Sequence, residues 1–208
     1  LLVSHLSRPS PGGIFVLSVR KEEVAPSFDI FFIISPGKFY HLLCIVNEAV
    51  LSQPQEVIME TRSATSFTQQ DWEHYARCYD RLNELTPYQA MLEEVARALR
   101  AQEGEHILDA ACGTGNLTTR LEQGSGAIVT GCDYSEVMLA RAQGKCGDRA
   151  PLLRTNLNRP LPFADHSFDA VACVNTLYAV AEPAHLLSEF SRVLRAGARI
   201  VLVTPKAG

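Results

Sequence analysis

The sequence lacks the features that mark several large classes of protein. It has 6 cysteines among 208 residues, but no C-x-x-C pair and no His/Cys spacing of the kind that holds a metal, so we expect reduced core cysteines and no metal site. No apolar run reaches the roughly 20 residues that a membrane-spanning helix requires. The net charge of -4 offers no basic surface to a phosphate backbone, so a nucleic-acid partner is not expected.

Methionine is absent from residues 1–58, which mix short apolar runs with scattered proline and glycine. Met59 is the first candidate start. We expect residues 1–58 to be an extension of doubtful structure, and an upstream extension, a translated non-coding stretch and the tail of another unit stay open as its origin. The apolar runs 28–34 and 42–46 are separated by residues 35–38, and no basic start leads into a signal-like run. We expect a cytoplasmic protein, and peripheral membrane contact stays open as an alternative.

The most informative segment is residues 107–118, in which an apolar run ends in an acid and is followed by a glycine turn. Gly113 and Gly115 can adopt positive φ and carry no Cβ, so the backbone can pass close to a ligand before a helix begins near Asn116. A second acid, Asp133, closes the next apolar run, where it can bind both hydroxyls of a ribose. This pattern predicts the nucleoside-binding half of a doubly wound parallel sheet.

Two classes of cofactor use such a half-sheet, and two residues separate them. Dinucleotide enzymes have G-x-G-x-x-G/A, whereas Thr118 occupies the last small position here. Asp109 lies four residues before Gly113, where a carboxylate would oppose a pyrophosphate but favour a cationic amino-acid group. The residues therefore favour S-adenosylmethionine, and a nicotinamide-dependent oxidoreductase is the less favoured alternative.

Residues 109–115 and 133–139 resemble the first two motifs of class I S-adenosylmethionine-dependent methyltransferases. Residues 155–163 and 167–171 are similar to the third motif and the fourth strand of that family. The resemblance spans about residues 72–205 and implies an α/β fold with a Rossmann-like, doubly wound, mainly parallel sheet. The family fold continues after its fifth strand with a helix and an antiparallel pair. Because this chain stops there, we expect the final strands to be lacking and the edge of the fifth strand to be unpaired.

The resemblance also implies which residues hold the cofactor. Asp133 would bind the ribose and Asp109 the amino-acid moiety, directly or through water. Ala111 stands where the family often has glycine, a change that we expect to be tolerated. Asn156 stands where many members have aspartate, and its amide oxygen can still accept a hydrogen bond from adenine. The expected cofactor contacts are Asp109, Ala111, Cys112, Gly113, Gly115, Asp133, Tyr134, Met138, Asn156, Leu157 and Asn175.

The sequence assigns no catalytic residue. Methyl transfer from a sulfonium is an in-line displacement with an activated donor, so positioning can supply much of the catalysis and a base is optional. Tyr178 could face the substrate or pack in the core. Cys112 is expected to pack beside the cofactor rather than to act as a nucleophile. His166 and His185 are expected to be solvated loop or cap residues.

Residues 59–101 are expected to form a helical lead-in to a cofactor-binding domain of residues 102–208. Within the lead-in, Tyr75 and Tyr79 could cover the cofactor or pack in the core. Residues 79–83 are similar to a segment of the ubiquinone and menaquinone biosynthesis methyltransferases, which act on apolar ring substrates. The expected function is methyl transfer to a small molecule of quinone- or lipid-like character. A cofactor-binding scaffold without catalysis is the alternative, and the sequence predicts no oligomeric state.

Overall fold

The computed structural model describes residues 2–6, 17–20, 29–33, 40–46, 79–80, 83 and 86–205 of the chain. Strands and helices alternate through the carboxyl-terminal two thirds of this part, as expected for a parallel sheet with crossover connections. The strands are β1 (Leu2–Leu6), β2 (Leu17–Arg20), β3 (Asp29–Ile33), β4 (Tyr40–Val46), β5 (His106–Ala110), β6 (Ile128–Asp133), β7 (Leu152–Arg154), β8 (Phe168–Val174) and β9 (Leu194–Pro205). The helices are α3 (Thr86–Leu99), α4 (Asn116–Ser125), α5 (Glu136–Cys146), the short 3-10 helix η2 (Leu177–Ala179) and α6 (Pro183–Val193).

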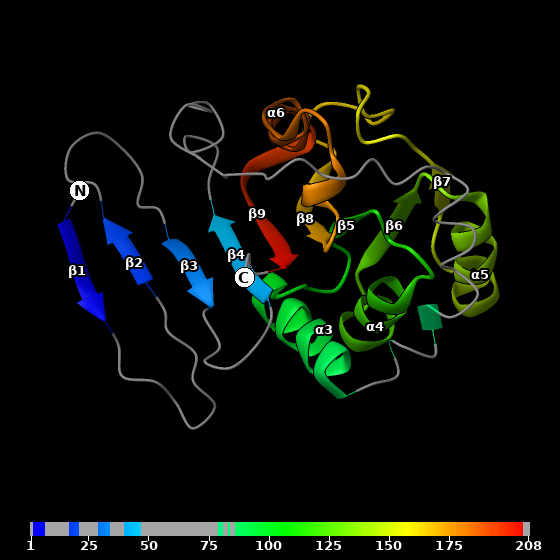
Figure 1. The fold of residues 1–208 in the computed structure, drawn as a ribbon, viewed down its shortest axis with the longest axis horizontal. Coiled ribbons are helices and arrows are strands. Elements are labelled where there is room, and N and C mark those ends of the chain that lie inside the picture. Colours follow the sequence, from blue (N-terminus) through cyan, green and yellow to red (C-terminus); the bar gives the residue numbers. More distant parts are fainter. Residues whose placement is uncertain are drawn as a thin grey trace.

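One 7-stranded sheet has the strand order β3-β4-β9-β8-β5-β6-β7 (Figure 1). The strands from β9 to β7 are parallel to one another. The chain runs outward from β5 through β6 to β7, then crosses back to β8 and continues to β9. The order therefore reverses between β5 and β8, and ligands of doubly wound sheets bind beyond the carboxyl ends of the strands at such a point. The expected Rossmann-like, mainly parallel sheet is confirmed.

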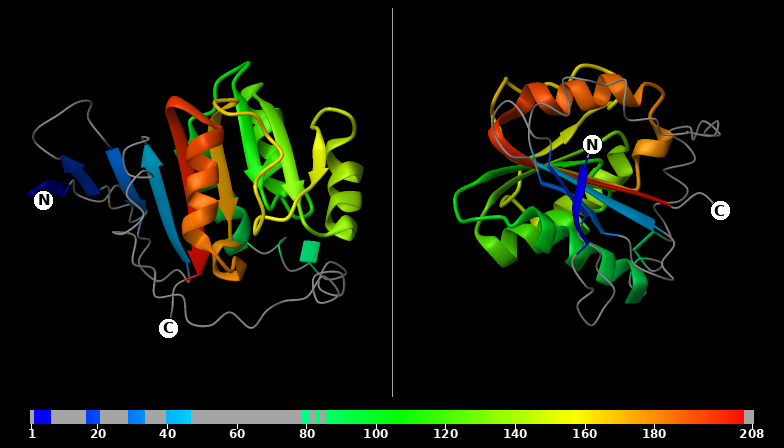
Figure 2. Two further views of the ribbon diagram at one scale, coloured as in Figure 1. Left: turned by 90° about the horizontal axis from the view of Figure 1, so that it is seen from above. Right: turned by 90° about the vertical axis from the view of Figure 1, so that its left-hand side faces the viewer.

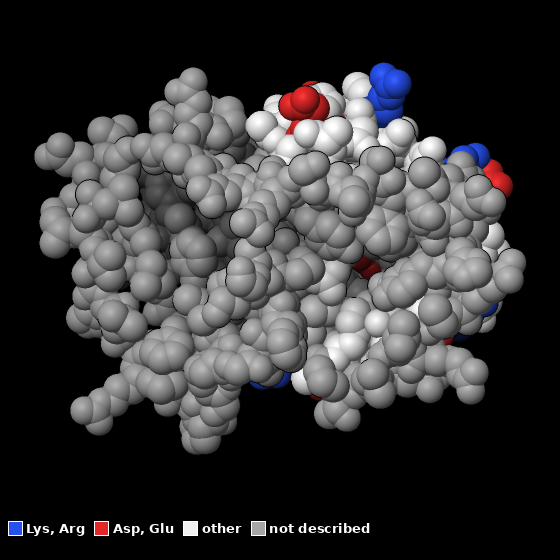
Figure 3. All heavy atoms as spheres, in the orientation of Figure 1, with Lys and Arg blue, Asp and Glu red and all other residues white. Residues whose placement is uncertain are grey.

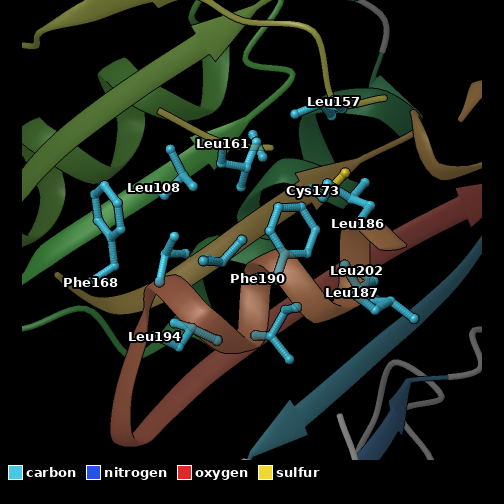
Figure 4. Packing of buried hydrophobic residues seen from close by; sticks show 14 of the residues in the cluster. Leu108, Leu157, Leu161, Phe168, Cys173, Leu186, Leu187, Phe190, Leu194 and Leu202 are labelled. Carbon is cyan, nitrogen blue, oxygen red and sulfur yellow. The ribbon is translucent and has the colours of Figure 1, made fainter. Parts of the chain in front are cut away.

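Helices cover both faces of the sheet, with α6 on one face and α3 and α4 on the other (Figure 2). Side chains of a strand alternate between the faces. Along β8, Val171 and Cys173 belong to the cluster under α6, whereas Ala170 and Ala172 belong to the cluster under α3 and α4. The ring of Phe190 on α6 packs between that helix and the strands (Figure 4). Two buried layers therefore hold the carboxyl ends of the strands in place.

The outer edge of β9 is paired, which differs from our expectation. β4 lies antiparallel to β9, from Val46 opposite Arg199 to Tyr40 opposite Pro205, and β3 pairs with β4. The expectation considered partners only after the fifth strand. An edge strand presents unpaired N–H and C=O groups that can pair with any extended segment, wherever that segment lies in the sequence. The expectation that residues 1–58 are an extension that is not native to the domain is not tested by this pairing and stays a prediction.

The helical lead-in is described only in part. The expected second helix is α3, which starts and ends within two residues of the predicted limits, 87–101. Tyr79, Asp80 and Asn83 are helical, in agreement with the helix expected before it. Tyr75 and the remainder of that helix lie outside the described residues.

Candidate functional site

The glycine loop, residues 111–115, joins β5 to α4 at the carboxyl edge of the sheet. Gly113 and Gly115 have φ of 55° and 76°, the left-handed region that glycine adopts without strain. Packing adds a second reason at Gly115, because a Cβ there would lie 3.1 Å from both Ala142 Cβ and Cys146 Sγ. The loop can therefore lie close to α5 only with glycine at that position.

Ala111 has the same left-handed conformation, with φ of 62°. The sequence comparison treated alanine for glycine here as a change of size. The structure shows that it is also a change of backbone preference, because a Cβ disfavours this region. Ala111 is thus a strained residue in the loop.

Asp133 joins the end of β6 to the glycine loop. Its Oδ2 accepts a hydrogen bond of 2.9 Å from Gly113 N, and its Oδ1 accepts one of 2.9 Å from Ser135 N. Burial raises the pKa of Asp133 above its ordinary value, although the backbone N–H groups of residues 113, 134 and 135 act against that rise. Each carboxylate oxygen has a further lone pair, so the side chain can still receive two hydroxyl groups.

Asp109 lies beneath the loop, on the face of β5 that meets α4. Its side chain is 2% exposed, and its Oδ2 accepts a 2.7 Å hydrogen bond from Thr118 Oγ1. Burial raises the pKa of Asp109 from 3.8 to about 6, with a smaller contribution from the charge of Asp133 and against the hydrogen bonds of Thr118. A carboxylate held there at neutral pH is costly to the free protein, a property common in functional sites.

Four more of the expected cofactor contacts lie around the ends of β6 and β7. Tyr134 is 41% exposed, and the guanidinium carbon of Arg154 lies 5.7 Å from its ring centroid. Met138 and Leu157 are buried. Asn156 Oδ1 accepts a 3.0 Å hydrogen bond from Asn158 N, so this amide oxygen stabilises a local turn. Tyr134 and Met138 follow Asp133 in the sequence, and Asn156 and Leu157 follow β7, the strand that pairs with β6.

Asn175 follows β8, across the switch point from the glycine loop. Its φ is 52°, a conformation that asparagine tolerates better than most residues. Its Nδ2 donates to Met91 Sδ at 3.7 Å, and its Oδ1 is buried without a hydrogen-bond partner among the described residues. A buried acceptor without a partner is rare in proteins. It fits a donor group supplied by a bound molecule.

Cys112 is 8% exposed, and burial, with the charges of Asp109 and Asp133, raises the pKa of its thiol well above the ordinary value. A neutral thiol is a poor nucleophile, which favours the packing role that we expected. Cys132, Cys146 and Cys173 are also buried. Across the described ranges, no group of three or more His, Cys, Asp or Glu residues could hold a metal ion.

Of the two histidines considered as candidates, His166 lies away from the carboxyl edge, whereas His185 lies in the helix that follows the carboxyl end of β8. His166 precedes β8, at the opposite end of that strand, and its Nδ1 lies 2.8 Å from Leu194 O. His185 is exposed in the first turn of α6. The side chain of Tyr178 lies outside the described residues. Neither histidine has a contact that assigns it as a base in the part of the chain that the structure describes.

Tyr79 lies over the glycine loop. A Cβ on Gly113 would be 3.6 Å from Tyr79 Oη, and this hydroxyl is 3.2 Å from that of Tyr88 on α3. The two rings meet edge to face, with centroids 6.4 Å apart. Of the two roles considered for Tyr79, this position supports a cover for the loop.

Sequence reasoning missed a polar cluster beside the cover, formed by Asp80, Thr114, Asn116, Arg141 and Lys145. These residues come from separate segments, so no local pattern could have joined them. The only signal was the resemblance of residues 79–83 to one group of methyltransferases.

The surface gives two further findings. Among the described residues, charged atoms of both signs border the face shown in Figure 3, without a large area of one sign. Of the helices in this part of the chain, none has the length and apolar character needed to cross a bilayer.

Comparison with known proteins gives matches of two kinds. A methyltransferase domain family matches residues 108–202. A demethylmenaquinone methyltransferase of Clavibacter sepedonicus is 38% identical over 136 residues, which cover 63% of this chain and 55% of the relative. The O-methyltransferase cnsE of Penicillium expansum is 33% identical over 116 residues, covering 54% of this chain and 42% of the relative. The chain thus spans about half the length of the curated relatives that it matches.

Solved structures agree on the fold. A chain in the complex between the Trm112 methyltransferase activator of Haloferax volcanii and a methyltransferase superposes with a TM-score of 0.57 and 24% identity. The match covers 62% of this chain and 57% of that one. Residues 108–202 therefore match a methyltransferase domain family, on a fold that a solved methyltransferase complex shares.

Proposed function

We propose that the chain binds S-adenosylmethionine at the carboxyl edge of β5, β6, β7 and β8 and transfers its methyl group to a small molecule. The observation that carries the proposal is the hydrogen bond from Gly113 N to Asp133, because it joins the residue expected to bind the ribose to the glycine loop. Asp133 would receive the ribose hydroxyls. Tyr134, Met138, Asn156 and Leu157 would surround the adenine.

Two buried polar groups support a cationic ligand rather than a pyrophosphate. Asp109 is charged at neutral pH despite its burial, with a pKa of about 6. Asn175 Oδ1 is a buried acceptor. An ammonium group bound between the loop and β8 would offset both costs, because it supplies positive charge and N–H donors. The amino-acid moiety of S-adenosylmethionine carries such a group, and a nicotinamide dinucleotide does not place one there.

The proposed chemistry depends mainly on positioning. Bound S-adenosylmethionine supplies a methyl group that is already activated by its sulfonium charge. The protein's part is to fix the cofactor with Asp133 and the loop, and to exclude water with Tyr79 above Gly113. An acceptor that must lose a proton would need a base, which is left unassigned.

The acceptor that we propose is a hydrophobic small molecule of quinone- or lipid-like character. Support comes from residues 79–83 and from the demethylmenaquinone methyltransferase relative. A cytoplasmic enzyme that reaches such a substrate at a membrane surface is consistent with the absence of a spanning helix in the described part. A nucleic-acid substrate is not favoured by the net charge of -4.

Calorimetric titration of the 208-residue chain with S-adenosylmethionine, S-adenosylhomocysteine and NAD tests the cofactor. We expect binding of the first two alone. Asp133→Ala should lose most of the affinity, since it removes both ribose contacts and the acceptor for Gly113 N–H. Cys112→Ser is the control and should lose little, because the loop acts mainly through its backbone. Equal losses in the two variants would contradict the assignment.

A methylation assay with demethylated quinols and phenols tests the reaction. Turnover by the unaltered chain that is lost in Asp133→Ala would support the proposed methyl transfer. Cofactor binding without turnover on any of these acceptors would favour the alternative of a binding scaffold.

A further inference from the structure

Lys145 of α5 binds oxygens from three separate segments. Its Nζ donates to Asp80 Oδ1 at 2.6 Å, to Asn116 Oδ1 at 2.7 Å and to Thr114 Oγ1 at 2.9 Å. An ammonium group has three N–H donors, so these contacts match its full capacity. One side chain thus connects the lead-in helix, the glycine loop and the start of α4.

Asp80 is the acceptor on which the cluster depends. Its Oδ1 also accepts a 2.6 Å hydrogen bond from Thr114 Oγ1, and Arg141 lies 3.5 Å from its Oδ2. Burial alone would raise the pKa of Asp80, but the hydrogen bonds from Lys145 and Thr114 and the nearby cations lower it below the ordinary value. The side chains of Lys145 and Asp80 are 32% and 26% exposed, so water screens this pair less than it screens a fully exposed one.

The polar cluster is next in sequence to Tyr79, the residue that covers the glycine loop. Asp80 directly follows Tyr79, whose ring lies over Gly113. Gly113 in turn donates its N–H to Asp133. Tyr79 therefore lies between the polar cluster and the loop whose Gly113 N–H binds Asp133, the residue expected to bind the ribose.

We propose that Lys145 is a positioning residue that sets how long the cofactor stays bound. Lys145 holds Asp80, which keeps Tyr79 over the glycine loop, and cofactor release requires this cluster to open. The inference rests on the proposed function, because it needs a cofactor in the site. Lys145 itself has no assigned contact with that cofactor.

The dissociation rate of S-adenosylhomocysteine from the 208-residue chain, followed by displacement in a stopped-flow instrument, is the readout. We expect Lys145→Met and Asp80→Asn each to accelerate dissociation about tenfold, the effect of losing a partly buried, charge-assisted hydrogen bond. The double variant should release S-adenosylhomocysteine at about the same rate as each single variant, since the two residues act through one contact.

Glu122→Gln is the matched control. It removes the 2.6 Å ion pair between Glu122 of α4 and Arg149, which lies in the turn after α5. We expect its dissociation rate to equal that of the wild type. If Lys145→Met and Asp80→Asn release the ligand at this same rate, the positioning role is wrong.

A failure of the proposed function would look different, because the unaltered chain would then not bind S-adenosylhomocysteine at all. Should a variant fail to fold, the salt dependence of the wild-type rate still tests the inference. Salt screens a partly exposed ion pair, so dissociation should be several-fold faster at about 0.5 M than at about 0.05 M salt. A rate independent of salt would overturn the proposal.

Discussion

Ala111 carries backbone strain that a glycine at the same position would relieve. Its φ of 62° lies where a residue with a Cβ is disfavoured by about 1–2 kcal/mol. We expect Ala111→Gly to raise the free energy of unfolding by about 0.5–1 kcal/mol, because relief of strain exceeds the entropy that glycine adds to the unfolded chain. Urea denaturation measures the change. Ala110→Gly, in β5 at 0% exposure, is the control and should destabilise; a loss of stability at both positions would contradict the argument.

Asp109 should make the stability of the free protein fall as the pH rises. Its pKa is about 6 in the folded protein, against an ordinary value of 3.8, so between these pH values the folded state binds more protons than the unfolded state. Stability is therefore lost as pH increases from about 4 to about 6, by up to roughly 3 kcal/mol. Asn has no such titration and can still accept the hydrogen bond from Thr118. We expect Asp109→Asn to be more stable than the wild type at pH 7.5 by about 1–3 kcal/mol.

Urea denaturation of both proteins at pH 4 and pH 7.5 isolates this effect from other titrating groups. The gain in stability should come with weaker binding of S-adenosylmethionine, since the variant lacks the charge proposed to face the ammonium group. The same dependence of stability on pH in both proteins would show that Asp109 is not the cause.

At the scale of elements, the sequence predicted what local patterns encode. The apolar run that ends at Asp109, the glycine turn and the acid at position 133 placed β5, α4 and β6 correctly. The periodicity of residues 87–101 placed α3. These features depend on neighbours within a few positions in the sequence, so strand and helix periodicity and turn chemistry reveal them.

Contacts between distant elements were not predictable in the same way. Lys145 meets Asp80 only because α5 and the lead-in helix approach each other in the fold, and nothing beside either residue indicates this. The pairing of β4 with β9 is a choice among extended apolar segments, and the pattern of either strand fits several partners. The strain at Ala111 was hidden because its size suits the loop although its backbone preference does not.

At the scale of the whole molecule, the pairing of β4 with β9 predicts how shortened chains behave. Deletion of residues 1–58 removes β3 and β4 and exposes the edge of β9, whose N–H and C=O groups would then be free to pair with another copy. Deletion of residues 1–28 removes only β1 and β2, which form a separate 2-stranded sheet. We expect the first chain to melt at a lower temperature than the 208-residue chain and to self-associate, and the second to behave like the full chain.

Size-exclusion chromatography with light scattering, together with a thermal melt, separates the outcomes. If only the chain that lacks residues 1–58 self-associates, β4 completes the sheet and the domain begins before Met59. If the chain from Met59 were instead as stable and as monodisperse as the full chain, β4 would be dispensable. Covering the edge of β9 would then contribute nothing that the domain needs for its stability or solubility.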